Sequence, residues 1–272
     1  MLTTWLEGGM GNQMFQYAMG LAQARRLGTD LRMAVNWYYE NGQFYRGYSL
    51  GLWEGVTQPA VRGVWPNVWE RSLPYDKFMM EKIKDGDCIA GSWQTERYFR
   101  EIRGELTNIF CPKQRMNQRA FDFIRMIRNE GSKSALLSIR RTDYLHADNG
   151  LMPQEYYLEA CKRVVEREPD PHFFVFSDDP GWCKQNFRIP YRFTVMEGND
   201  QTSLDHLGRE DEDMWSMRFC HHAVTINSSF SWWGAWLSPL PVEERVVVAP
   251  KRWSLNPAFD FRDIVPEGWT KI

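Results

Sequence analysis

The sequence has no long hydrophobic run, no closely spaced cysteine pair and almost no net charge. No stretch approaches the roughly 20 apolar residues of a membrane-spanning helix, and residues 1–7 are not a basic region followed by a long apolar run. The five cysteines form no C-x-x-C pair, which argues against a zinc site of that spacing, and their odd, scattered set fits a reducing compartment. A net charge of −2 gives no support to nucleic-acid binding. We therefore expect a cytoplasmic chain without a transmembrane segment, and peripheral membrane association stays open.

Three motifs of common enzyme classes are also missing. Neither G-x-S-x-G nor H-E-x-x-H occurs, which argues against a serine hydrolase elbow and a zinc-protease helix. The dinucleotide fingerprint G-x-G-x-x-G is absent as well, so an NAD-dependent oxidoreductase is an alternative only at the level of fold. What is abundant is aromatic: 15% of the chain, with 13 Trp, which fits either a stiff core or a carbohydrate site.

Strand and helix patterns alternate in both halves of the chain. Residues 2–6 predict a strand, Gly8-Gly-Met-Gly11 a loop, 13–27 a helix that stops at Gly28, and 30–35 the next strand, which is the opening unit of a Rossmann-like sheet. The second half repeats this rhythm. A polar stretch at 131–134 suggests a boundary between domains 1–130 and 131–272. The length of 272 residues accommodates two such α/β domains, which we expect to face a cleft.

The segment 134–144 carries the first candidate site. An apolar run, residues 135–139, has the character of a buried strand and ends abruptly in Arg140, Arg141 and Asp143. Ligands of open α/β sheets bind outside the carboxyl ends of the strands, and the guanidinium fork suits phosphate. The segment therefore predicts a site for a phosphorylated ligand, or alternatively a solvated loop with an Arg–Asp ion pair.

Further candidates follow other predicted strands. Ser228 and Ser229 lie where a strand enters a helix, so they could hold phosphate oxygens or simply cap the helix. Asp213 could accept two hydrogen bonds from guanine or simply favour a helix N-terminus. Asp178 and Asp179 lack an evident third metal ligand, so a structural role at a strand end is the better interpretation.

Three segments in order resemble one enzyme family. They are Gly8-Gly-Met-Gly-Asn-Gln-Met-Phe-Gln-Tyr-Ala18, Ile139-Arg-Arg-Thr-Asp-Tyr144, and Asp213 with Asn227-Ser-Ser-Phe-Ser-Trp-Trp-Gly-Ala-Trp236. Together they look like the α-1,2-fucosyltransferases of glycosyltransferase family 11, and the match runs from about residue 4 to residue 249. Residues 91–94, Gly-Ser-Trp-Gln, resemble a further family segment.

The resemblance implies a fold, a reaction and roles for residues. The fold is of the GT-B type, and the reaction is an inverting, metal-independent transfer of L-fucose from GDP-fucose to the 2-hydroxyl of a galactose-containing acceptor glycan, with no cofactor. Arg140 would bind the diphosphate, Arg141 would support its loop and Asp213 would read guanine. The remaining donor-binding residues implied are Gly9, Gly11, Asn12, Ser228, Ser229 and Phe230.

Two points of the resemblance stay open. The family usually has His where this chain has Ser138, two residues before the first arginine, which puts donor affinity or base preference in doubt. Inversion calls for a base on the acceptor hydroxyl, and Asp143 is the candidate as the carboxylate nearest the phosphate clamp. Alternatives are a fucosyltransferase for another acceptor (α-1,6 or protein O-linked) and a catalytically impaired nucleotide-sugar-binding protein.

Overall fold

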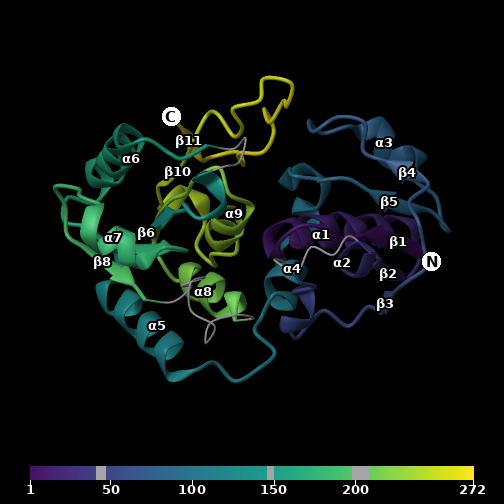
Figure 1. Cartoon of the computed structure of the whole chain (residues 1–272), viewed down its shortest axis with the longest axis horizontal. Coiled ribbons are helices and arrows are strands. Elements are labelled where there is room, and N and C mark those ends of the chain that lie inside the picture. The colour runs from purple at the N-terminus through teal and green to yellow at the C-terminus, as the bar shows by residue number, and fades with distance from the viewer. Residues whose placement is uncertain (41–46, 146–149, 198–208) are drawn as a thin grey trace. The chain divides into compact units, whose positions relative to one another are not determined.

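The chain folds into two compact units (Figure 1). The computed structural model describes residues 1–40, 47–145, 150–197 and 209–272. Unit 1 comprises Met1–Lys113 and Phe259–Pro266, and unit 2 comprises Gln114–Ala258 and Glu267–Ile272. The division thus falls between Lys113 and Gln114 rather than at 130/131, because the helix after Gln114 packs against strand and helix of unit 2.

Unit 1 is built on a parallel sheet. Its described strands are β1 (Leu2–Trp5), β2 (Leu31–Ala34), β3 (Ala60–Val61), β4 (Val68–Trp69) and β5 (Cys88–Ala90). Its described α-helices are α1 (Met10–Leu27), α2 (Trp37–Glu40), α3 (Lys77–Lys82) and α4 (Arg103–Ile109). The strand order is β3-β2-β1-β5-β4, so β1 lies at the centre and the loop after it opens at the middle of the sheet's carboxyl edge.

Helix α1 packs tightly on β1. A Cβ on Gly20 would lie 2.9 Å from the Cβ of Thr4, so a side chain at this position would push the helix off the strand. The helix ends at Gly28, whose φ of 62° is the left-handed conformation that glycine adopts without a Cβ penalty. It begins at Met10, not at residue 13 as the sequence predicted, so Gly11 and Asn12 belong to its first turn.

Unit 2 is built on a second parallel sheet. Its described strands are β6 (Ser134–Ile139), β7 (His172–Ser177), β8 (Phe193–Met196), β9 (His222–Val224), β10 (Val247–Ala249) and β11 (Thr270–Lys271). Its described α-helices are α5 (Gln118–Glu130), α6 (Gln154–Arg167), α7 (Pro180–Asn186), α8 (Glu210–Met217) and α9 (Ser229–Trp236). The order β11-β10-β9-β6-β7-β8 places β6 between β9 and β7.

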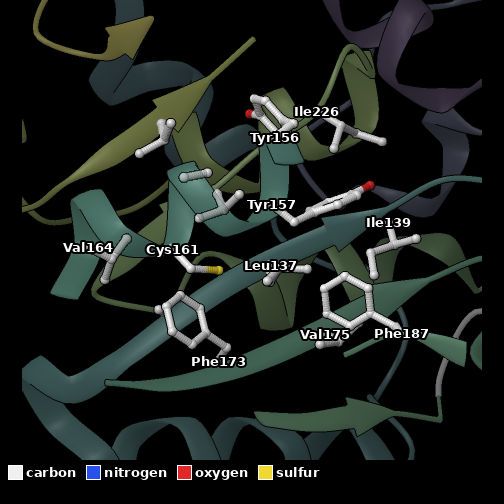
Figure 2. Close-up of a cluster of buried hydrophobic side chains, with 14 of the residues drawn as sticks. Leu137, Ile139, Tyr156, Tyr157, Cys161, Val164, Phe173, Val175, Phe187 and Ile226 are labelled. Atoms are coloured by element: carbon white, nitrogen blue, oxygen red, sulfur yellow. The ribbon is translucent and has the colours of Figure 1, made fainter. Parts of the chain in front are cut away.

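Strand β6 is buried on both faces, which explains its continuous apolar run. Leu137 and Ile139 join the cluster that Tyr157 and Val164 of α6 complete, as Figure 2 shows. Leu136 faces the other way, into a cluster with residues of α5, α8 and α9. Helices therefore cover both faces of the sheet, and only its edges and strand ends reach solvent.

The described part of the aromatic segment 36–85 contains only short elements, among them α2, β3, β4 and α3. The two strands have two residues each, too short to show a periodic pattern. Residues 41–46 of this aromatic segment lie outside the described ranges.

Candidate functional site

Asp178 organises the carboxyl edge of the unit 2 sheet. It follows β7, and its buried carboxylate accepts hydrogen bonds from the backbone N–H groups of Arg141 (2.9 Å) and Thr142 (3.1 Å) and from the Thr142 hydroxyl (2.5 Å). Because β6 and β7 are parallel neighbours, their carboxyl ends meet at this edge. The carboxylate thereby fixes the turn that leaves β6. The sequence pattern indicated a structural role for Asp178 at a strand end, but not this pairing with the turn after β6.

Arg140 is anchored by one edge of its guanidinium. Its Nε lies 2.8 Å from Oδ1 of Asp143 and 3.1 Å from Oδ2 of Asp178. Its terminal nitrogens make no hydrogen bond within the described ranges. Burial opposes the charge, but the hydrogen bond to Asp143 and the charge of Asp178 outweigh it and raise the pKa of Arg140. The side chain thus presents a fixed, permanently charged fork with two unused ends.

Arg141 is held by contacts different from those of Arg140. Its guanidinium carbon lies 3.6 Å from the ring centre of Trp182 on α7, and its Nε lies 3.6 Å from Asp179. Asp179 in turn caps α7 by accepting from the N–H of Trp182 at 2.9 Å. Stacking on an indole immobilises a guanidinium, and α7 therefore stiffens the loop beside Arg140.

The loop from β9 into α9 forms the next part of this edge. The Tyr144 hydroxyl donates to the backbone oxygen of Asn227 at 2.7 Å and so ties the β6 loop to it. Ser228 occupies the N-cap position of α9, but neither its hydroxyl nor that of Ser229 forms a hydrogen bond within the described residues. Simple capping by side chains is therefore not what these serines do. Phe230 is half-buried and packs against the apolar cluster of α5, α8 and α9.

Asp213 is a buried carboxylate in the first turn of α8. Burial raises its pKa to about 7, although Arg119, whose Nη2 lies 4.0 Å from Oδ1, works in the opposite direction. Its acidic neighbours on the same helix, Glu212, Glu210 and Asp211, add to the rise. A carboxyl group with this pKa changes charge near neutral pH, so any ligand that needs its ionised form binds in a pH-dependent way.

In unit 1 the corresponding loop joins β1 to α1. Gly8 has a φ of 74°, and a Cβ on it would lie 2.7 Å from Nδ2 of Asn12. Gly9 is the N-cap residue of α1 and has no side chain to cap the helix, while Gly11 and Asn12 form its first turn. Oδ1 of Asn12 accepts a hydrogen bond of 3.0 Å from Nε2 of Gln94. Glycine thus keeps the helix start open, and the amide of Asn12 is held in one orientation.

The structure gathers Arg140, Arg141, Asp143, Ser228 and Ser229 on the segments that follow β6 and β9 at one edge of the unit 2 sheet, with Asp213 on α8 of the same unit. Gly9, Gly11 and Asn12 lie on unit 1. In the described part of the chain no three His, Cys, Asp or Glu side chains gather closely enough to hold a metal ion. None of the described helices is both long and apolar enough to cross a bilayer.

Two α/β units, each built on a parallel sheet, define a protein of the GT-B type. Residues 56–272 match the model of "Glycosyl transferase family 11". The chain belongs to this family, which confirms the resemblance drawn from the three sequence segments and removes the oxidoreductase alternative.

Relatives span a range of names and similarities. An "Alpha-1,2-colitosyltransferase" of Escherichia coli is 30% identical over 98% of this chain and 97% of its own length. "Galactoside 2-alpha-L-fucosyltransferase SEC1" of Bos taurus is 24% identical over 85% of this chain and 63% of its own length. Among solved structures, the fucosyltransferase NodZ from Bradyrhizobium is 12% identical, with a TM-score of 0.44 over 88% of this chain and 93% of that one.

Proposed function

We propose that this glycosyltransferase moves L-fucose from GDP-fucose to the 2-hydroxyl of a galactoside, with inversion at the anomeric carbon and without a metal ion or cofactor. The observation that carries the proposal is the anchored guanidinium of Arg140, whose unused terminal nitrogens suit a diphosphate. Family membership and the name of the fucosyltransferase relative support the choice of donor and linkage.

The donor is expected to use three further features of unit 2. The hydroxyls of Ser228 and Ser229 and the start of α9 offer donors to phosphate oxygens. Phe230, the next residue of the same turn, is expected to lie against the bound phosphates. Asp213, when ionised, accepts two hydrogen bonds from the N1–H and N2–H₂ edge of guanine, which adenine and uracil do not present in this arrangement. The start of α1 in unit 1, with Gly9, Gly11 and Asn12, is expected to contact the substrate as well.

Transfer breaks the bond between the anomeric carbon and the phosphate oxygen, and the leaving GDP gains negative charge. The fixed charge of Arg140 meets that charge as it develops, where one such contact is worth about 2.7–4 kcal/mol. A cation supplied by the protein in this way is what would let the reaction proceed without a metal ion. We therefore expect turnover to be unchanged by a chelator such as EDTA.

The acceptor hydroxyl must lose a proton as the new bond forms. Asp143 stays the predicted base, but its Oδ1 is engaged by Nε of Arg140 at 2.8 Å. An engaged carboxylate is better placed to orient the guanidinium than to take a proton. Retention of full kcat by Asp143→Asn, with an intact fold, would move the base elsewhere.

A second donor is favoured by one specific observation, the 30% identity to a colitosyltransferase over nearly the whole of both chains. Colitose differs from fucose by the lack of the 3-hydroxyl group. A site built to hydrogen-bond that hydroxyl discriminates strongly against the deoxy sugar, whereas an apolar site at this point does not. The two donors are therefore distinguishable by kcat/KM.

The test is a calorimetric titration with GDP, ADP and UDP, followed by transfer assays with GDP-fucose and GDP-colitose on β-galactosides. Of the three nucleotides, we expect only GDP to bind tightly, and we expect this binding to be lost in Asp213→Ala. In the transfer assay we expect fucose to be transferred to a 2-hydroxyl with inverted configuration. A chain that binds no GDP, or that binds it and transfers nothing to any sugar, contradicts the proposal. Transfer of fucose to a 6-hydroxyl or to protein would keep the donor and replace the acceptor.

A further inference from the structure

A second carboxylate lies at the carboxyl edge of the other sheet, in unit 1. Glu70 follows β4 directly, and the loop Gly91–Gln94 follows its neighbour β5. Oε2 of Glu70 accepts from the N–H of Ser92 at 2.7 Å and from that of Trp93 at 3.1 Å, and Oε1 accepts from Trp93 at 3.2 Å. The carboxylate therefore fastens the loop by its backbone.

The fastened loop is strained. Trp93 has a φ of 52°, and it is the only non-glycine residue of the described ranges with a positive φ. Its indole N–H is buried with no hydrogen-bond acceptor among the described residues. A bulky residue in this conformation and a buried unpaired donor each cost stability, and such costs concentrate where a function needs the geometry.

The neighbouring glycine shows how closely Glu70 fits the loop. A Cβ on Gly91 would lie 2.4 Å from the Cβ of Glu70 and 2.8 Å from its Oε2. Only glycine allows the carboxylate to reach the two N–H groups. Burial also raises the pKa of Glu70 to about 7, although the hydrogen bonds from the N–H groups of Trp93 and Ser92 lower it. The fold therefore keeps a carboxyl group where burial disfavours its charged form.

The loop ends at the α1 start. Gln94, next to the strained Trp93, donates from Nε2 to Oδ1 of Asn12 at 3.0 Å. Asn12 has no other side-chain hydrogen bond in the described residues, so the orientation of its amide depends on Gln94. With Oδ1 occupied, the N–H₂ group is the part of the amide that a ligand can use.

We propose that Glu70 is a positioning residue of the transferase: it holds Trp93 in its left-handed conformation and, through Gln94, fixes Asn12 for contact with the substrate. This inference rests on the proposed function, in which the start of α1 contacts substrate. It assigns Glu70 no proton transfer.

The test is a double-mutant cycle on kcat/KM for GDP-fucose, assayed at pH 8, where the carboxyl of Glu70 is ionised. We expect Asn12→Ala and Glu70→Gln each to lower kcat/KM by about 10–100-fold, as small misplacements in an active site do. If Glu70 acts through Asn12, the double mutant is no worse than Asn12→Ala alone. Multiplication of the two effects, or no effect of Glu70→Gln, would overturn the inference.

Further variants separate positioning from a loss of folding. Gln94→Ala breaks only the last link and should reproduce the loss of kcat/KM with an unchanged melting temperature, even if Glu70→Gln does not fold. The matched control is Glu81→Gln on α3, an exposed carboxylate of the same unit whose loss should leave kcat/KM unchanged. A wild-type protein that binds GDP and transfers fucose while Gln94→Ala is fully active refutes the positioning role alone. A wild type that does neither refutes the proposed function and this inference together.

Discussion

At the scale of single residues, Arg140 owes its usefulness to two carboxylates that hold only one side of it. Asp143 and Asp178 engage Nε, so the guanidinium keeps its charge and its direction while its terminal nitrogens stay available. A residue anchored in this way loses little entropy when it binds a phosphate, since its orientation is already set.

Replacement of Arg140 is therefore expected to affect the reaction more than the fold. Arg140→Ala should lower kcat with GDP-fucose at least about a hundredfold, because the charge on the leaving diphosphate is no longer met. Arg140→Lys should recover little, since an ammonium has no Nε edge for the two carboxylates. Steady-state kinetics measure both, with Arg163→Ala on the exposed face of α6 as the control. Near-normal turnover of Arg140→Ala would remove this residue from the mechanism.

The proposed role of Asp213 predicts that nucleotide binding depends on pH. In the proposed site guanine binds the ionised carboxylate, so protonation below a pKa of about 7 would compete with GDP. From pH 8 to pH 6 we expect the Kd for GDP to rise about tenfold, with proton release on binding at pH 6. Calorimetry in buffers of different ionisation enthalpy measures both.

The raised pKa of Asp213 has the opposite effect on the stability of the unliganded protein: stability falls with rising pH, whereas GDP binding strengthens. The folded-state pKa lies above the value of about 3.9 of an unfolded aspartate. The stabilising contribution of Asp213 to the free energy of unfolding is therefore fully present below about pH 4 and is lost as the pH rises through about 7.

The control for the pH dependence of GDP binding is Asp213→Asn, in which this dependence should vanish. A Kd for the wild type that does not change with pH would show that guanine does not meet this carboxylate.

At the scale of elements, a glycine that ends one helix and a glycine within another should respond to alanine in opposite directions. Gly28 ends α1 at a φ of 62°, and a Cβ there meets nothing within 4 Å, so Gly28→Ala pays only the backbone cost of about 1 kcal/mol. Gly104 lies inside α4, where a Cβ also meets nothing within 4 Å, so Gly104→Ala should stabilise by about 0.5–1 kcal/mol. Urea unfolding of both variants is the measurement. Destabilisation of equal size would contradict a left-handed backbone at Gly28 and a helical backbone at Gly104.

The elements also show where sequence patterns were sufficient. The apolar run of β6 and the glycine stop of α1 were visible, because burial on both faces and a left-handed helix end leave direct traces in residue type. Strands β3 and β4 leave no such trace, since a strand of two residues shows no alternating pattern. Arg140 stood out as a charge at a strand end, whereas the role of Asp178 emerges only when β7 is placed beside β6. Glu70 left no trace, because its partners are backbone N–H groups, which every sequence has.

At the scale of the whole molecule, the nucleotide is expected to stabilise one unit through a few strand ends. GDP at a hundred times its Kd should add about 2.7 kcal/mol to the free energy of unfolding. Hydrogen exchange should slow in the loops after β6, β7 and β9 and in the first turn of α8, all of them in unit 2. Thermal unfolding with exchange mass spectrometry measures both, and protection confined to unit 1 would be incompatible with the donor site described here.

The path of residues 259–272 has a consequence for synthesis on the ribosome. Asp263 brings this path into unit 1, where it accepts from the backbone N–H of Tyr75 and pairs with Arg97, and β11 then returns to pair with β10 of unit 2. Neither unit can therefore close its contact set while the nascent chain is still missing these residues. The two units therefore cannot complete their folding strictly one after the other as the chain is synthesised, and a ribosome stalled before residue 259 would hold two incomplete units.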